Sequence, residues 1–169
     1  GKPEGEVAVL TLKDLRVEDI MSQAPSTLPA GATVGEAVDI LQKQALSAAP
    51  LVDEAGAPIG VVSRSLLLQI LAPVVTGGGV GSLEEVRARS LVEAGLSPAC
   101  TCAPSTLLTA ACKQMVKSRS HFVVVVDSGA VVGIVSTTDA ARTIACLDEV
   151  SPLESPLPKF EPFREGIPT

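Results

Sequence analysis

The sequence lacks tryptophan and tyrosine and has only three phenylalanines among its 169 residues. Proteins that bind single-stranded nucleic acids use aromatic stacking and a basic surface, whereas this chain has a formal net charge of −6. We therefore expect no nucleic-acid binding. An anionic ligand would need locally arranged donors, because the net charge of the protein repels it.

Histidine and cysteine are also scarce. One histidine and four cysteines do not provide the ligand set of a standard zinc site, and four cysteines are too few for a disulfide scaffold in a chain of this length. We expect free thiols and no metal site.

Long apolar runs are missing. The longest uninterrupted one, Phe122 to Val126, is far too short to cross a bilayer, and no basic segment followed by an apolar one opens the chain. We expect an intracellular, soluble protein without a membrane span. The sequence does not distinguish the cytoplasm from the lumen of an organelle.

A repeat organises the chain. Apolar residues at i, i+3, i+4 and i+7 predict one face of an amphipathic helix, and the pattern recurs 74 residues later. Each predicted helix precedes a short apolar strand that ends in an aspartate. The two sets are Val34, Ala37, Val38, Leu41 and Asp53, and then Leu108, Ala111, Cys112, Met115 and Asp127.

Each aspartate opens a turn that contains a glycine, Gly56 or Gly129, and the second turn is one residue shorter than the first. A second apolar run follows, as a hairpin requires, and then a second helix. The unit is therefore helix, strand, strand and helix, twice, which predicts an α+β fold. The predicted second strands span 59–63 and 131–136, and the second helices 66–71 and 139–144.

Five segments follow from this repeat. They are an N-terminal segment (1–14), a first domain (15–73), a glycine-rich linker with a linking helix (74–90), a second domain (91–147) and a proline-rich tail (148–169). The linking helix could run from 82 to 94, and we expect it to belong to neither core. The prolines exclude a regular helix in the tail. Phe160 and Phe163 could pin the tail to a surface, or it could be a disordered linker.

The repeated unit resembles the cystathionine-β-synthase (CBS) domain. The pattern of that domain is Thr-Val-x-Glu-Ala, a helix, an apolar strand ending in Asp, and then a glycine, two apolar residues, Ser or Thr, two variable residues and Asp. The first copy has Thr33-Val-Gly-Glu-Ala37 and Gly60-Val-Val-Ser63, and the second has Gly133-Ile-Val-Ser-Thr-Thr-Asp139. The resemblance implies two copies of a βαββα-like unit that pair through their sheets into a disc-like Bateman module. It also implies that clefts between the copies bind adenosyl compounds without catalysis.

The string from Gly133 to Asp139 runs from a predicted strand into a predicted helix. Backbone N–H groups and the positive end of the helix dipole make such a junction favourable for phosphate, even on an acidic protein. The resemblance implies that Ser136 binds phosphate, that Asp139 accepts bonds from both ribose hydroxyls, and that Gly133 allows close approach of the backbone. Thr138 faces the same region.

Some of these residues also have an ordinary structural interpretation. A serine followed three residues later by an acid, as in Ser136 and Asp139, is close to a capping box, which stabilises a helix without a ligand. By the resemblance His121 contacts phosphate, but it could equally be an exposed histidine before a strand. The repeat favours a ligand in both cases.

The resemblance places the adenine against Thr101 and the backbone of Phe122 and Val123. In the first copy Leu66 stands where the second has its aspartate. Leucine cannot accept a bond from ribose, and each unpaired hydroxyl would cost about 1 to 3 kcal/mol. We therefore expect one nucleotide per chain. By the resemblance the first copy still supplies phosphate contacts to that ligand, from Ser47, Arg64 and Ser65.

These observations predict a regulatory module that binds AMP, ADP, ATP or S-adenosylmethionine, with Mg²⁺ if the ligand is ATP, and that has no catalytic cofactor. The alternative is a ligand-free scaffold for dimerisation or protein interaction. A thiol enzyme that uses Cys100 or Cys102 with His121 is a third hypothesis, but no residue can be assigned to orient the histidine. The resemblance also implies a homodimer formed through helices and a regulated partner of unknown identity.

Overall fold

The computed structural model describes residues 11–79, 81–96 and 99–148. Except for residue 148, the predicted tail with Phe160 and Phe163 lies outside these ranges. The elements follow in the order α1 (Val17–Ile20), β1 (Ser22–Gln23), β2 (Leu28–Pro29), α2 (Val34–Lys43), β3 (Ala48–Val52), β4 (Pro58–Ser63), α3 (Arg64–Val75), α4 (Leu83–Ala88), β5 (Thr101–Cys102), α5 (Leu108–Ser118), β6 (Phe122–Asp127), β7 (Ala130–Ser136) and α6 (Thr137–Asp148). Every helix and strand that the repeat predicts is present.

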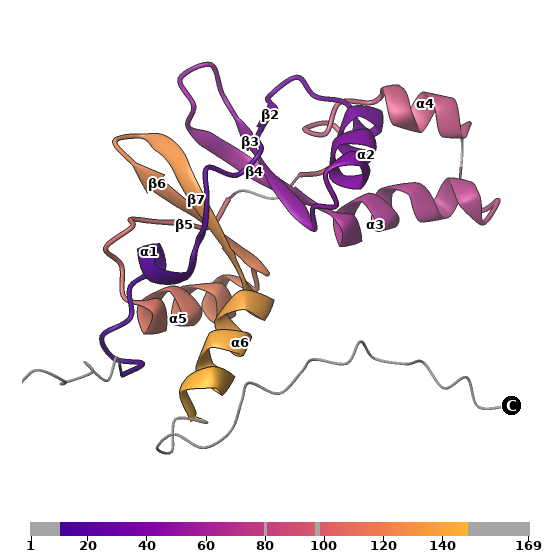
Figure 1. The fold of residues 1–169 in the computed structure, drawn as a ribbon. Helices are drawn as coiled ribbons and strands as arrows, with labels where there is room; N and C mark the ends of the chain where they lie inside the picture. Colours follow the sequence, from indigo (N-terminus) through magenta and orange to yellow (C-terminus); the bar gives the residue numbers. More distant parts are fainter. Residues whose placement is uncertain (1–10, 80, 97–98, 149–169) are drawn as a thin grey trace, which may run out of the picture.

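The strands form two sheets, each built on one of the predicted hairpins. One sheet has the order β2-β3-β4 and the other the order β1-β7-β6-β5. The sheets contact each other through β4 and β6, and the backbone N–H of Val131 donates to the carbonyl oxygen of Gly56 at 3.2 Å. Each sheet carries its own helices on its outer side (Figure 1). The predicted α+β fold with paired sheets is confirmed.

The two hairpin turns explain the difference in length between the repeats. Ser128 and Gly129 both have positive φ, at 51° and 81°, which suits a tight two-residue hairpin turn. The first turn is longer, and Asp53 holds it because its Oδ1 accepts from the backbone N–H groups of Ala55 and Ala57, both at 2.9 Å. The first copy therefore runs one residue longer than the second before the next helix.

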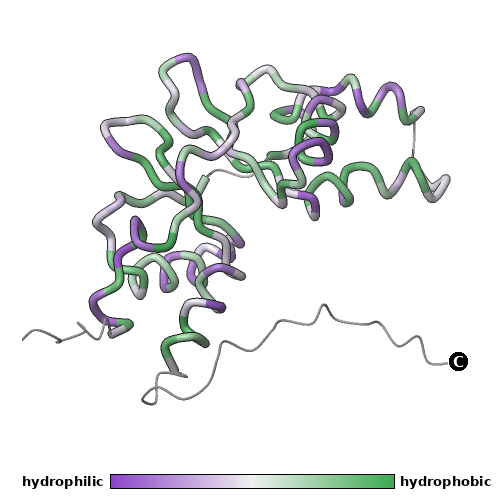
Figure 2. The backbone as a smooth tube through the Cα atoms, in the orientation of Figure 1, coloured by the Kyte–Doolittle hydropathy of each residue, from purple (hydrophilic) through white to green (hydrophobic). Residues whose placement is uncertain are grey.

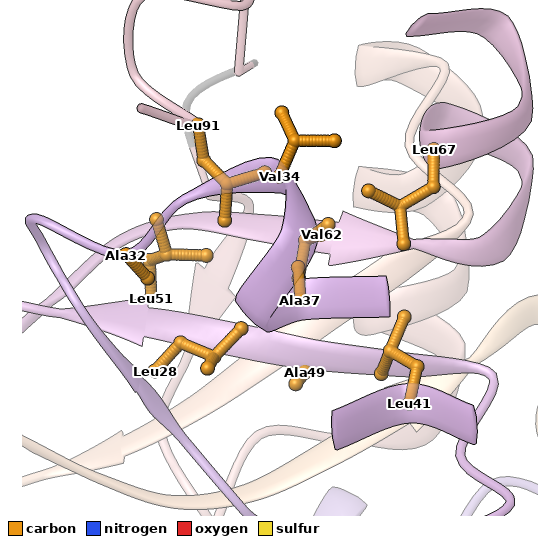
Figure 3. Packing of buried hydrophobic residues seen from close by; sticks show 10 residues of the cluster. All are labelled: Leu28, Ala32, Val34, Ala37, Leu41, Ala49, Leu51, Val62, Leu67 and Leu91. Carbon is orange, nitrogen blue, oxygen red and sulfur yellow. The ribbon is translucent and has the colours of Figure 1, made fainter. Parts of the chain in front are cut away.

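Each half has its own apolar core. Full burial of a valine or leucine side chain contributes about 1.5 to 3 kcal/mol, and the predicted inner face of α2 supplies part of the first core. The first core, drawn in Figure 3, consists of Leu28, Ala32, Val34, Ala37, Leu41, Ala49, Leu51, Val62, Leu67 and Leu91. The second consists of Leu15, Val17, Leu108, Ala111, Met115, Val123, Val125, Val135 and Ala140.

The segment that leads into each repeat packs in the core of the other half. Val17, near the start of the first repeat, is fully buried in the second core, and Leu91, 74 residues later, is fully buried in the first core. Two backbone hydrogen bonds made by these segments are related by the same shift of 74 residues. The N–H of Leu108 donates to Leu15 O at 2.8 Å, and that of Val34 to Arg89 O at 2.9 Å.

The expectation that the linking helix belongs to neither core is wrong. Helix α4 is only six residues long, and the chain is extended at Arg89, with φ −70° and ψ 140°. The extended chain brings Leu91 into the first core, while Val86 of α4 is also buried. The linker is therefore part of the packing of the first half.

Helix α3 is apolar along most of its length (Figure 2). Leu67 is buried, but Leu68 is 68% exposed and Val75 is 72% exposed. A groove between α2 and α3 continues this apolar surface. Among the described residues no helix has the length and apolar character needed to cross a bilayer.

Candidate ligand-binding clefts between the repeats

The predicted site begins where β7 meets α6. The backbone N–H of Asp139 donates to Ser136 Oγ at 3.0 Å, and the N–H of Ser136 donates to Asp139 Oδ2 at 3.2 Å. This is the reciprocal pattern of a capping box. The other oxygen, Asp139 Oδ1, lies 3.9 Å from Arg142 Nη1, and the Asp139 side chain is 38% exposed. One carboxylate oxygen therefore holds the helix start, and among the described residues the other has only a long ion pair.

Asp139 also borders a cleft, which we name the Asp139 cleft. Its volume is about 280 Å³. Its lining residues come from β1 and the segment after it, from the start of β3, and from the β6, β7 and α6 region. They are Ser22, Gln23, Ala24, Pro25, Ser26, Leu46, Ser47, Ala48, Phe122, Ile134, Ser136 and Asp139. The capping interaction and an open cleft therefore coexist at this aspartate.

The segment from Ser22 to Ser26 is held by both halves of the molecule. Ser22 pairs with Ile134 of β7, and the backbone N–H of Ala24 donates to Val132 O at 3.1 Å. On the other side Ser26 Oγ donates to Gln44 Oε1 just after α2, at 2.5 Å. These contacts make the segment a defined wall of the Asp139 cleft.

A second space, the central space, adjoins the Asp139 cleft and has a volume of about 510 Å³. It shares Ser22, Ser47, Phe122, Ser136 and Asp139 with the Asp139 cleft. The residues that it adds are Ser65, Thr137, Thr138, His121 and Arg142. Seven of the predicted site residues thus line the central space: Ser47, Ser65, His121, Phe122, Ser136, Thr138 and Asp139.

Backbone hydrogen bonds place the residue before the first strand of each hairpin next to the helix that follows the hairpin. The N–H of Thr137, the first residue of α6, donates to His121 O at 2.9 Å, and the N–H of Arg64 donates to Ser47 O at 3.0 Å. His121 is therefore fixed beside the start of α6, and Ser47 beside the start of α3. The repeat brings these two positions to the central space from opposite halves.

The first repeat forms a related cleft, the Leu66 cleft, with a volume of about 210 Å³. Ser63 Oγ accepts from the N–H of Leu66 at 3.1 Å, so half of the capping pattern remains. In place of the aspartate of the second repeat, the first repeat has Leu66, whose side chain packs against the first core. The cleft is lined by Val61, Ser63, Ser65, Leu66, Gln69, Ala99, Cys100, Arg119, Ser120, His121 and Phe122.

Two residues predicted to hold the base lie elsewhere. Thr101 is exposed on β5, its carbonyl oxygen accepts from Gln114 Nε2 at 2.8 Å, and its neighbour Cys100 lines the Leu66 cleft. Val123 is fully buried in the second core. Phe122 does line the Asp139 cleft.

Arg64 and Gly133 are also placed differently from the sequence-based expectation. Arg64 lines the groove between α2 and α3, together with Val38 and Leu68, and does not line the central space. Gly133 is buried, and a Cβ there would collide with the side chain of Met21. The close approach that this glycine allows is that of a methionine of the same chain.

The sequence reasoning missed the wall formed by residues 22–26 and the contribution of Leu46 and Ala48. The wall follows from the exchange of the leading segments, because the chain that enters the opposite half lines the cleft, whereas Leu46 and Ala48 come from the connection between α2 and β3 and the start of β3. The repeat could have identified this wall, because Ser26 in the Asp139 cleft and Cys100 in the Leu66 cleft are 74 residues apart and so occupy equivalent positions.

The four thiols are free. Burial, as the main cause, raises the pKa of Cys102 above its ordinary value; the Thr106 hydroxyl opposes this shift and nearby Cys100 adds to it. Burial also raises the pKa of Cys112. A raised pKa disfavours the nucleophilic thiolate. Cys100 and His121 both line the Leu66 cleft, but no side-chain hydrogen bond joins these two described residues. Within the described ranges no group of His, Cys, Asp and Glu side chains could hold a metal ion.

Comparison with known proteins identifies the repeat. The family model of the CBS domain matches residues 17–73 and 88–146, and no protein of curated function matches the chain. Among solved structures, the chain is similar to the CBS domain pair of protein MJ0100 in complex with 5′-methylthioadenosine and S-adenosyl-L-methionine. Identity is 26%, coverage is 78% of this chain and 97% of that one, and the TM-score is 0.61.

Two further structures share the fold. CBSX2 in complex with AMP is 19% identical, with 79% of this chain and 98% of that one covered and a TM-score of 0.61. The CBS domain of the bacterial CNNM/CorC family Mg²⁺ transporter in complex with ATP is also 19% identical. Here 79% of this chain and 89% of that one are covered, and the TM-score is 0.64.

Proposed function

We propose that this chain, which belongs to the CBS-domain family, is a regulatory module that binds an adenosyl ligand in the Asp139 cleft and thereby controls a partner or a fused domain. Solved CBS relatives are complexes with AMP, with ATP, and with methylthioadenosine and S-adenosylmethionine. The chemistry common to these ligands is an adenine on a ribose whose 2′ and 3′ hydroxyls can be recognised by a carboxylate.

The position of Asp139 is the observation that carries the proposal. Its carboxylate lies in the first turn of a twelve-residue helix and borders the cleft, and its Oδ1 is engaged only at 3.9 Å. In the proposal Asp139 accepts bonds from the ribose hydroxyls, while Ser136 and Thr138 stand beside the first phosphate at the positive end of α6.

In the proposal the remaining parts of the ligand contact the neighbouring walls. The adenine lies between the segment 22–26 and the 46–48 segment, where Pro25, Leu46 and Ala48 offer apolar surface. The first phosphate lies in the central space beside the first turn of α6 and His121, and this space continues towards Ser47 and Ser65. If the ligand is ATP, Mg²⁺ accompanies it.

Isothermal titration of AMP, ADP, ATP and S-adenosylmethionine into the purified chain tests this function. At least one ligand should bind with a stoichiometry of one, and the Asp139→Ala variant should lose that binding. Glu84→Ala is the matched control, because Glu84 also lies in the first turn of a helix but does not line these clefts. The proposed function fails if none of the four compounds gives heat.

A ligand-free scaffold is the second candidate, and the apolar surface of α3 favours it. Leu68 and Val75 are largely exposed, and a groove lined by Leu67, Leu68 and Leu71 lies beside them. The scaffold would be a homodimer formed through these helices. Light scattering distinguishes the two candidates: the scaffold predicts a Leu68-dependent dimer that neither nucleotide nor Asp139→Ala changes.

A further inference from the structure

The central space, into which the phosphate of the proposed ligand extends, offers few cations. Among the described residues that line it, only Arg142 and His121 are basic, and Asp139 is acidic. Arg142 Nη1 lies 3.9 Å from Asp139 Oδ1, so its charge is partly offset at the site itself. With a neutral imidazole, the formal charge of this lining is zero.

The first repeat contributes hydroxyl groups to this space. Ser47 and Ser65 both line it and both are exposed. A hydroxyl can donate a hydrogen bond to a phosphate oxygen, but it brings no positive charge to offset the charge of the phosphate. The contribution of Ser47 and Ser65 to the lining is therefore polar but uncharged.

A single phosphate is well matched to these surroundings. It carries a charge of about −1.5 to −2 at neutral pH, and it can sit beside the N-terminal turn of α6 and His121. In the proposal a second and a third phosphate extend past that turn towards Ser47 and Ser65, where the first repeat supplies no charge. The next cation, Arg119, lines the adjoining Leu66 cleft and not the central space. The formal net charge of the chain, −6, adds a repulsive field.

We propose that the Asp139 cleft selects adenosyl ligands with one phosphate over those with three, and that Ser47 and Ser65 set this limit. The inference rests on the proposed function and names the ligand class within it. Only the charge around the distal phosphates distinguishes AMP from ATP here, because both present the same adenine and ribose to the same walls.

Titration calorimetry without divalent cations tests the selection on the full chain. AMP should bind more tightly than ADP, and ADP more tightly than ATP, with about tenfold or more between the first and the last. The Ser47→Lys/Ser65→Lys double variant should raise the affinity for ATP and narrow or invert the order. Ser47→Gln/Ser65→Gln, with long but neutral side chains, is the matched control and should keep the parent order.

The outcomes separate this inference from the function on which it rests. Equal affinities of the parent chain for AMP and ATP overturn the selection but leave adenosyl binding intact. The selection by charge is equally overturned if the lysine variant keeps the parent order, or if the glutamine variant changes it as the lysine variant does. Absence of heat with all three nucleotides also overturns the selection, and absence of heat with S-adenosylmethionine as well contradicts the proposed function itself.

Discussion

Ser136 and Asp139 hydrogen-bond each other twice across the first turn of α6, with the N–H of each residue donating to the side-chain oxygen of the other, at 3.0 and 3.2 Å. The proposed ligand contact and the start of the helix therefore depend on the same carboxylate. Occupation of the cleft would add bonds to a group that is already held in position, which reduces the ordering that binding requires.

This double role separates two substitutions at Asp139. Asp139→Ala should remove adenosyl binding and also lower the free energy of unfolding by about 0.5 to 1 kcal/mol, because α6 loses its acidic capping partner. Asp139→Asn keeps an oxygen acceptor for the Ser136 N–H. It should therefore retain most of the stability while still losing at least tenfold in affinity, since the charge and one acceptor are gone. Urea unfolding and calorimetry measure the two effects, and unchanged binding in the asparagine variant would count against a ribose contact.

Leu66 marks the position at which the two clefts differ most. Ser63 already accepts from the Leu66 N–H at 3.1 Å, so an aspartate there would complete a second capping box beside the Leu66 cleft. Leu66→Asp should raise the stoichiometry of AMP binding from one to two per chain in a calorimetric titration. Leu66→Ala, which removes the leucine without adding a carboxylate, should remain at one. A ratio of one in both variants would show that the carboxylate alone does not make a ribose site.

The exchanged segments predict where the first half is vulnerable. Leu91 is fully buried in the first core although it follows the linker, while the adjacent Val92 is 55% exposed. Leu91→Ala should lower the free energy of unfolding by about 2 to 5 kcal/mol. Val92→Ala should change it by less than about 0.5 kcal/mol. Denaturant unfolding of both variants is the measurement, and similar small effects would mean that the linker does not support the core.

The thiols should differ in reactivity. Burial raises the pKa of Cys102 above the ordinary thiol value of 9.0, so the reactive thiolate is rarer at a given pH. Cys146 is exposed. At about pH 8 iodoacetamide should modify Cys146 well before Cys102 in the folded protein, and the difference should vanish in denaturant. Peptide mass mapping over time checks this, and faster modification of Cys102 would revive a catalytic role for the thiol pair.

Local patterns in the sequence predicted the elements of the fold well. The helix faces of α2 and α5 follow from apolar spacing, and each hairpin follows from two apolar runs around a glycine turn. The residues of the β7 to α6 junction followed from the repeated string. These features depend on neighbours in the chain, where periodicity is informative.

The exchange between the halves was not predictable in the same way. Val17 and Leu91 are apolar residues in short segments without a periodic pattern, and their packing depends on contacts far along the chain. The base was consequently assigned to Thr101, whereas residues 22–26 form the wall of the Asp139 cleft. The resemblance assigned Arg64 to the phosphates, yet this residue, in the first turn of α3, lines the groove between α2 and α3.

The most direct measurement is a crystal structure of the chain grown with saturating AMP. Binding at the Asp139 cleft predicts ribose hydroxyls within hydrogen-bond distance of the Asp139 carboxylate, adenine between residues 22–26 and 46–48, and phosphate beside His121. A nucleotide seated in the Leu66 cleft, or an Asp139 cleft without nucleotide at that concentration, would contradict it.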